Sequence, residues 1–261
     1  MFGPIFFAAP LAEFGAEHLT NSRSISQLVP PWMPAHMFWT WFVGIALIAA
    51  AVGIALRIHV RTAAMLLGIM FMCFVLVIQI PNVVANPHNR IFWAIAFRDL
   101  AFAGGAFALA ATPVKPLRIV ARFFVAVPLL FFAVEHFLHP QSAPGVPLEM
   151  VTPDWVPIRA FWGCLTGAAL LISGAAMLVL SRHARLAATL LGSLLALLVL
   201  FLYLPILLTA AQPALLEGIN YVGDTLLFAG VVLLAAAIMP GGVSQAAVAR
   251  DEVPAPPSHA Q

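Results

Sequence analysis

Residues 37–56 read MFWTWFVGIALIAAAVGIAL, twenty residues without a charged side chain, with His36 before them and Arg57 after them. A helix that crosses a membrane needs about 20 consecutive apolar residues. Runs of similar length recur along the whole chain. They predict eight membrane helices, at about 2–18, 36–56, 62–81, 90–111, 118–138, 159–180, 185–206 and 218–239. We therefore expect an all-α polytopic membrane protein.

The composition of the 261-residue chain indicates the same class. Hydrophobic residues make up 63% of it and charged residues 8%, and the mean hydropathy is +1.03. A soluble domain carries about 25% charged residues, so this chain has too few polar side chains to cover a water-facing surface. Its 12 Lys and Arg against 10 Asp and Glu leave a net charge of only +2. These values exclude a soluble enzyme, a disordered tail protein and a nucleic-acid binder, and they make the lipid bilayer the first partner.

The two ends of the chain differ in composition. Residues 1–4 lack the basic region of a cleavable signal peptide, so we expect the first helix to be retained. Residues 241–261 are rich in proline and polar side chains, which is typical of a disordered tail. Cys73 and Cys164 stand alone in apolar runs, and this spacing argues against dithiol chemistry.

The basic residues in the connections predict the orientation of the chain. Eight Lys and Arg fall on the side that holds both termini, and three fall on the other side: Arg23, Arg90 and Arg159. Connections rich in Lys and Arg stay on the cytoplasmic side. We therefore expect both termini to be cytoplasmic. Setting this orientation is a sufficient role for the basic residues of the connections.

The sequence repeats itself. Residues 29–56 and 152–179 share 8 of 28 positions without a gap, including two Trp and two Pro in register. Further matches pair Glu17-His18 with Glu135-His136, Arg61 with Arg185, Pro81 with Pro205, and Asp99 with Asp224. We call residues 1–112 the first half and residues 113–240 the second half. Each half holds four expected spans, and this even number predicts two parallel four-helix bundles related by a pseudo-two-fold axis along the membrane normal.

A four-span unit whose first helix ends in an acidic residue, followed by a loop with Pro and Trp, resembles the DoxX-like membrane protein superfamily. In this chain the loops contain Pro30, Trp32 and Pro34 in the first half, and Pro153, Trp155 and Pro157 in the second. The resemblance covers residues 1–240 as two copies, whereas the usual unit is single. It implies a bacterial cytoplasmic (inner) membrane protein that works beside quinone and a redox partner protein. The sequence itself contains no haem or nucleotide motif, so the cofactor stays unknown.

Some charged side chains inside the expected spans are candidates for a polar site, because a charge in a membrane costs about 2.5–3.5 kcal/mol and tends to face the bundle interior. They are Glu13, Glu17, Arg98, Asp99, Glu135 and Asp224. One interpretation is an outer rim of hydrogen-bonded carboxylates with Trp32 and Trp155 at the membrane boundary. The other is a pair of related sites, in which Asp99 or Asp224 acts with Glu17 or Glu135 to bind a quinone head or relay a proton.

Histidines gather on the outer side of the predicted topology. Glu135, His136 and His139 have the spacing to share one helix face, and His18 with Glu17 is the counterpart of His136 with Glu135. Imidazole and carboxylate suit zinc, copper or iron. His139 has no counterpart in the first half, however, so we expect no metal site, and His136 and His139 are only the nearest candidates for one.

The two halves differ at one pair of charged positions. Glu13 corresponds to Phe131, and Arg98 corresponds to Gly223, so the acid and the base occur together in the first half only. A lone charge in a membrane is costly, and a paired charge is less so. We therefore expect the first and fourth spans to be neighbours and Glu13 to pair with Arg98. The alternative is that Arg98 pairs with Asp99 or Glu17.

Three functions from different classes stay open at this point. The first is a membrane subunit associated with quinone-linked redox chemistry, as the resemblance implies. The second is a small-solute or ion transporter, suggested by the duplication, the intramembrane carboxylates and helices broken near Pro10, Pro81, Pro128 and Pro205. The third is a non-catalytic membrane assembly partner. No Walker loop, dinucleotide fingerprint or nucleophile elbow is present, and no catalytic residue is assigned.

Overall fold

The computed structural model describes residues 2–111, 114–146, 149–211 and 214–240, and the expected tail at 241–261 lies outside them. The described chain is helical, as expected, and contains no strand; an isolated bridge joins Ser142 to Val151. The helices in chain order are α1 (Gly3–Thr20), α2 (Ser22–Ile25), η1 (Ser26–Leu28), α3 (His36–Ala55), α4 (Val60–Phe74), η2 (Val75–Gln79), α5 (Ile80–Ala85), α6 (Arg90–Ala110), α7 (Lys115–Leu138), α8 (Arg159–Leu178), α9 (Ala184–Leu198), η3 (Val199–Tyr203), α10 (Leu204–Thr209) and α11 (Ala214–Ile238).

Seven helices in the described chain are long and apolar enough to cross a membrane. They are α3, the continuous rod α4-η2-α5, α6, α7, α8, the continuous rod α9-η3-α10, and α11. The eighth expected span, α1, is a helix at the expected place but is not one of the seven, because Glu13 and Glu17 lower its hydropathy. The helical, apolar segments are those of an integral membrane protein.

The prolines do not break the helices as expected. Pro10 and Pro128 lie inside the continuous helices α1 and α7. Pro81 and Pro205 each follow a π-helical turn, and the helix that was expected to close at Pro205 continues to Thr209. A proline within a helix lacks an N–H and its ring clashes with the carbonyl four residues before it. The wider π turn accommodates this local misfit without ending the rod.

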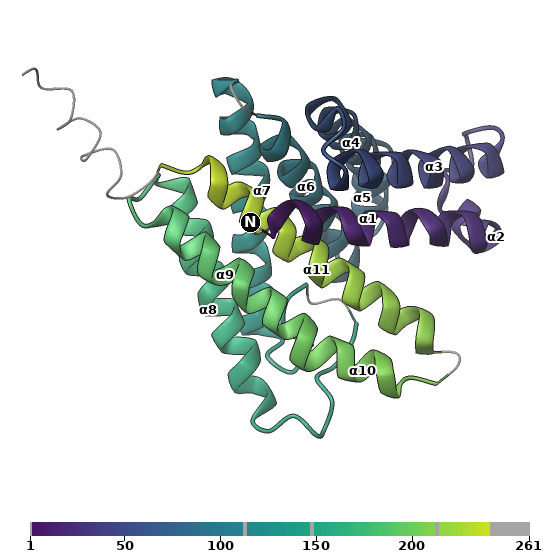
Figure 1. Cartoon of the computed structure of the whole chain (residues 1–261). Helices are drawn as coiled ribbons and strands as arrows, with labels where there is room; N and C mark the ends of the chain where they lie inside the picture. Colours follow the sequence, from purple (N-terminus) through teal and green to yellow (C-terminus); the bar gives the residue numbers. More distant parts are fainter. Residues whose placement is uncertain (1, 112–113, 147–148, 212–213, 241–261) are drawn as a thin grey trace, which may run out of the picture.

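The helices of the two halves pack against each other rather than as two separate bundles. Helix α1 packs on α3 and on α11, and in the same way α7 packs on α8 and on α6. Helix α4 packs on α6 and α9 on α11, while α6 and α11 contact each other at the centre. Figure 1 shows α11 running between α1 and α9. The first helix of each half thus lies against the last helix of the other half.

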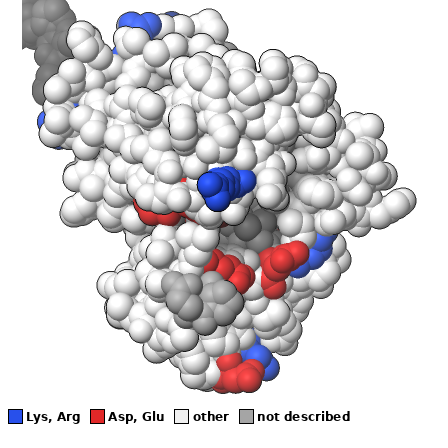
Figure 2. Space-filling model, turned by 90° about the vertical axis from the view of Figure 1, so that its right-hand side faces the viewer, with Lys and Arg blue, Asp and Glu red and all other residues white. Residues whose placement is uncertain are grey.

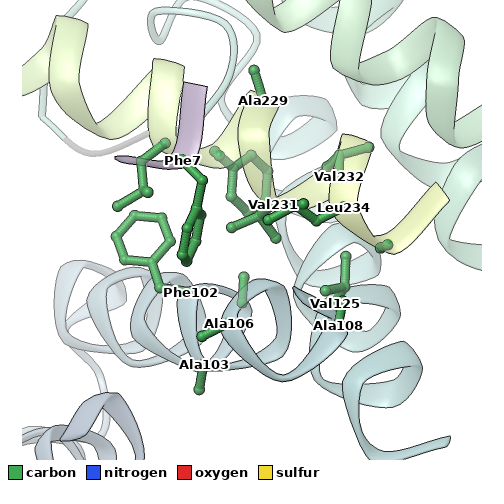
Figure 3. Packing of buried hydrophobic residues seen from close by; sticks show 14 of the residues in the cluster. Phe7, Phe102, Ala103, Ala106, Ala108, Val125, Ala229, Val231, Val232 and Leu234 are labelled. Atoms are coloured by element: carbon green, nitrogen blue, oxygen red, sulfur yellow. The ribbon is translucent and has the colours of Figure 1, made fainter. Parts of the chain in front are cut away.

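Small residues permit the close packing at the centre. A Cβ on Gly105 of α6 would lie 2.6 Å from Cγ2 of Val231 on α11, and a Cβ on Gly230 would lie 2.6 Å from the backbone nitrogen of Phe7 on α1. Figure 3 shows Phe7, Phe102 and Val231 meeting between α1, α6 and α11. Close contact through small residues is a main source of helix association in membranes. This core holds α6 and α11 together about two turns along the helices from Asp99 and Asp224.

Candidate functional site

Arg98, Asp99 and Asp224 form one hydrogen-bonded cluster between α6 and α11. Nη1 of Arg98 donates to Oδ2 of Asp224 at 2.8 Å, and Nε and Nη2 of Arg98 lie 3.3 and 3.2 Å from Oδ1 of Asp99. The two aspartates are 4% and 5% exposed. One guanidinium therefore compensates two buried carboxylates, which lowers the cost of burying all three charges.

Gln79 completes this cluster from a third element. Its Nε2 donates to Oδ2 of Asp99 at 2.8 Å, and its side chain is buried. Gln79 is the last residue of the π turn before Ile80 and Pro81, so the irregular turn carries a polar side chain that contacts α6. Gln79 was not among the site residues predicted from the sequence. A single amide in the otherwise apolar stretch 66–81 was the signal for it.

The expected ion pair between Glu13 and Arg98 is wrong. Arg98 pairs with Asp99, as the alternative proposed, and with Asp224, which was not considered. Glu13 lies instead against Gly223, where a Cβ would be 2.8 Å from Oε2 of the glutamate. The reason is that α1 packs on α11 of the other half rather than on α6. Oε2 of Glu13 is buried without a hydrogen-bond partner in the described chain.

Glu17 and Glu135 do not join the aspartates. Glu135 is buried and accepts a hydrogen bond from Nη1 of Arg90 at 3.2 Å, which ties the end of α7 to the start of α6. Glu17 accepts from Nδ2 of Asn220 on α11 at 3.4 Å. One of the two interpretations of the sequence was a pair of related sites, each with one aspartate and one glutamate. The structure brings the two aspartates together in one cluster; Glu17 lines the same cavity but binds Asn220, and Glu135 binds Arg90.

The candidate metal ligands are not assembled in the described chain, which contains no group of three or more His, Cys, Asp or Glu placed to hold a metal ion. His136 is fully buried, its Nδ1 lies 2.7 Å from the carbonyl oxygen of Phe132, and its Nε2 accepts from the Gly145 N–H at 3.0 Å. Both ring nitrogens are therefore occupied. His139 caps α7 and is exposed, and Trp32 and Trp155 are also exposed.

A cavity of about 1730 Å³ lies in the first half. Its walls come from α1, α3, α4, η2 and α6, and α11 closes one side. Most of the lining is apolar. Exposed side chains of α3 and α4, such as Phe42 and Leu66, are part of the wall, so the cavity opens between these two helices.

The polar side chains of the cavity lining include the cluster described above, and others such as Glu17, His18 and Asn220. Arg98, Asp99, Gln79 and Asp224 all line the cavity. The Arg98 side chain is 22% exposed and its Cζ lies 5.7 Å from the ring centre of Phe102, another lining residue. The cavity therefore combines a mostly apolar wall with charged and hydrogen-bonding groups, among them the Arg98 cluster.

The surface shows the same contrast. Figure 2 shows a face that is almost entirely uncharged, on which most of the visible acidic and basic side chains gather around a hollow near the middle. A surface with so few charged side chains is typical of a protein that contacts lipid.

Comparison with known proteins gives one match. Residues 7–99 are similar to the family described as a domain of unknown function (DUF8561). The match lies within the first half and runs from α1 to Asp99 of α6, so it spans most of the helices around the cavity. No curated protein and no solved structure matches the chain.

Proposed function

We propose that this protein binds a lipid-soluble molecule with a small polar head in the cavity of its first half. The observation that carries the proposal is the cavity itself. Its lining is mostly apolar, it opens between α3 and α4, and the Arg98 cluster forms part of its wall. The head lies at the cluster, and the apolar part lies along α3 and α4. Entry is lateral, from the bilayer.

Size and chemistry support this assignment. Ligand pockets are usually about 300–1,000 Å³ and mostly apolar, with a few convergent polar groups. The cavity here is larger, about 1730 Å³, and accommodates a molecule with a long chain. Acyl chains alone form no hydrogen bonds with a charged cluster. Charged side chains in a membrane are costly and usually pair with one another or contact a ligand.

Quinones belong to this ligand class, since they combine a polar ring with an apolar chain. The resemblance to DoxX-like proteins supports a quinone-associated role beside a redox partner protein in the bacterial inner membrane. The distribution of Lys and Arg supports an orientation with both termini cytoplasmic. We propose this role as the specific form of the ligand-binding function.

The test is to identify what copurifies with the protein. Purified protein is extracted, and its small molecules are measured by mass spectrometry against Ala49→Trp, which places an indole on the cavity wall. Ala55→Trp is the matched control, because Ala55 is also exposed on α3 but does not line the cavity.

We expect one amphiphile near stoichiometric amount in the wild type and in Ala55→Trp, and its loss in Ala49→Trp. Recovery of bulk membrane phospholipid only, in equal amounts from all three proteins, would refute the proposal.

A further inference from the structure

The connection between α7 and α8 passes through the interior of the second half. Residues 142–146 are all buried, with Ala143 and Val146 each 1% exposed. Ala143 packs with Leu202, Tyr203 and Tyr221. A connection normally runs over the surface, because its backbone polar groups need partners. Backbone groups of residues 142–146 form hydrogen bonds inside the protein instead.

Two side chains bind the peptide between Pro144 and Gly145. The N–H of Gly145 donates to Nε2 of His136 at 3.0 Å, and the hydroxyl of Tyr203 donates to the carbonyl oxygen of Pro144 at 2.8 Å. His136 belongs to α7, and Tyr203 is the last residue of the π turn η3. The buried loop is thus held by one hydrogen-bond acceptor and one donor.

The corresponding positions in the first half line the open cavity. His136 corresponds to His18 of α1, and Tyr203, two residues before Pro205, corresponds to Gln79, two residues before Pro81. Both His18 and Gln79 are lining residues. The cavity therefore lies where the second half holds its own loop.

The lengths of the two connections explain the difference. Thirteen positions separate Glu17 from Pro30, whereas eighteen separate Glu135 from Pro153, so the second connection is longer by five residues. The longer connection extends far enough for residues 142–146 to be buried in the interior.

A glycine marks the same difference on the neighbouring helix. A Cβ on Gly163 of α8 would lie 2.3 Å from the carbonyl oxygen of Pro140, so the loop leaves no room for a side chain there. The corresponding residue of α3 is Thr40, whose side chain lines the open cavity. In the second half, α8 thus packs directly against the connection between α7 and α8. In the first half, the corresponding position of α3 faces the cavity.

We infer, on the basis of the proposed function, that the loop occupies the place of the ligand and that the ligand of the first half donates a hydrogen bond to Nε2 of His18. Nδ1 of His18 lies 2.7 Å from the carbonyl oxygen of Phe14, as Nδ1 of His136 does from that of Phe132. A carbonyl oxygen only accepts, so Nδ1 carries the hydrogen, and in this tautomer Nε2 is a hydrogen-bond acceptor.

This arrangement selects the ligand class. The head carries a hydroxyl or an amide N–H, as the Gly145 peptide does. A quinol has such a donor, whereas the oxygens of a quinone only accept.

The test uses a decyl-substituted hydroquinone and its dimethyl ether as probes, with binding to the purified full-length protein counted by native mass spectrometry. We expect the hydroquinone to bind the wild type roughly tenfold more tightly than the ether, as one buried hydrogen bond implies. His18→Phe should bind both probes equally. His36→Phe is the control, since His36 does not line the cavity, and it should keep the preference.

The outcomes separate the two proposals. If neither probe binds the wild type, the ligand-binding function itself fails for this class. If the wild type binds both probes equally, or if His18→Phe keeps the preference, binding stands and the hydrogen bond to His18 is overturned. Binding of the ether to His18→Phe also shows that this variant is folded.

Discussion

Arg98 is the residue on which the polar centre depends. Its guanidinium contacts Asp99 on the same helix and Asp224 on α11, so one side chain joins the two halves. Without it, two carboxylates would face each other in an apolar interior. The cost of an uncompensated buried charge exceeds the gain from any single ion pair. Arg98 therefore matters more for stability than either aspartate does.

This asymmetry predicts the order of stability of three variants. Arg98→Gln should destabilise the purified protein by about 3 kcal/mol, because it leaves both carboxylates unpaired. Asp224→Asn should cost less, since Arg98 keeps Asp99. The double variant Arg98→Gln/Asp224→Asn should be more stable than Arg98→Gln alone. Thermal unfolding in detergent measures this order.

Arg23→Gln serves as the control for loss of a positive charge, because Arg23 is exposed in α2. It should leave the Tm unchanged. A double variant less stable than Arg98→Gln would contradict the role assigned to Arg98.

Among the elements, the two π turns are the irregular features that build the site. They occupy Val75–Gln79 and Val199–Tyr203, each directly before a short helix whose second residue is proline. Each ends in the side chain that contacts the interior, Gln79 toward Asp99 and Tyr203 toward Pro144. π turns inside helices are rare and often occur at functional sites.

If Pro81 causes its π turn, replacing it should regularise the helix. We expect Pro81→Ala to slow amide hydrogen exchange in Ile80–Ala85, because an added N–H and a regular ladder raise the free energy of local opening. The same change should weaken the contact of Gln79 with Asp99 and so reduce ligand retention. Hydrogen exchange with mass spectrometry measures the first effect.

Pro128→Ala is the matched control, since Pro128 lies in the continuous helix α7 without a π turn. It should leave exchange in Ile80–Ala85 unchanged. Equal exchange in that segment for the wild type and Pro81→Ala would show that the proline does not set the geometry.

At the scale of the whole molecule, the two halves complete each other. Helix α1 lies on α11, and α7 lies on α6, so each half covers its first helix with the last helix of the other. Gly230 of α11 lets the backbone of Phe7 on α1 approach closely, and Gly105 of α6 does the same for Val231 on α11. Interfaces of this kind, with small residues and tight packing, are stable in lipid.

This exchange of helices predicts the behaviour of a split protein. Residues 1–112 and residues 113–261, expressed separately, should each be degraded, because α1 then lacks α11 and α7 lacks α6. Coexpressed, they should copurify through a tag on one half at close to equal amounts. A stable, monodisperse first half on its own would show that the contact between α1 and α11 is dispensable.

The helices themselves were readable from the sequence. Residues 37–56 predict α3, and the observed helix His36–Ala55 agrees with that range. A membrane helix satisfies its own backbone hydrogen bonds and must meet only a length and an apolar composition. Both requirements depend only on the local sequence, so a single stretch of residues is enough to predict a membrane helix. The polar residues Arg98, Asp99 and Asp224 were also identified as candidates, because charges in an apolar run are conspicuous.

The partners of these residues came only from the tertiary structure. Depth along the helix placed Glu13 near Arg98, but the packing of α1 on α11 turned Glu13 to Gly223 and left Arg98 to Asp224. Which helices become neighbours depends on how small residues and side-chain shapes fit across the whole interior. The cavity, too, appears only in the tertiary structure, as does the burial of residues 142–146 in the longer connection of the second half. Local apolarity determined where helices form, and long-range packing decided which side chains they bring together.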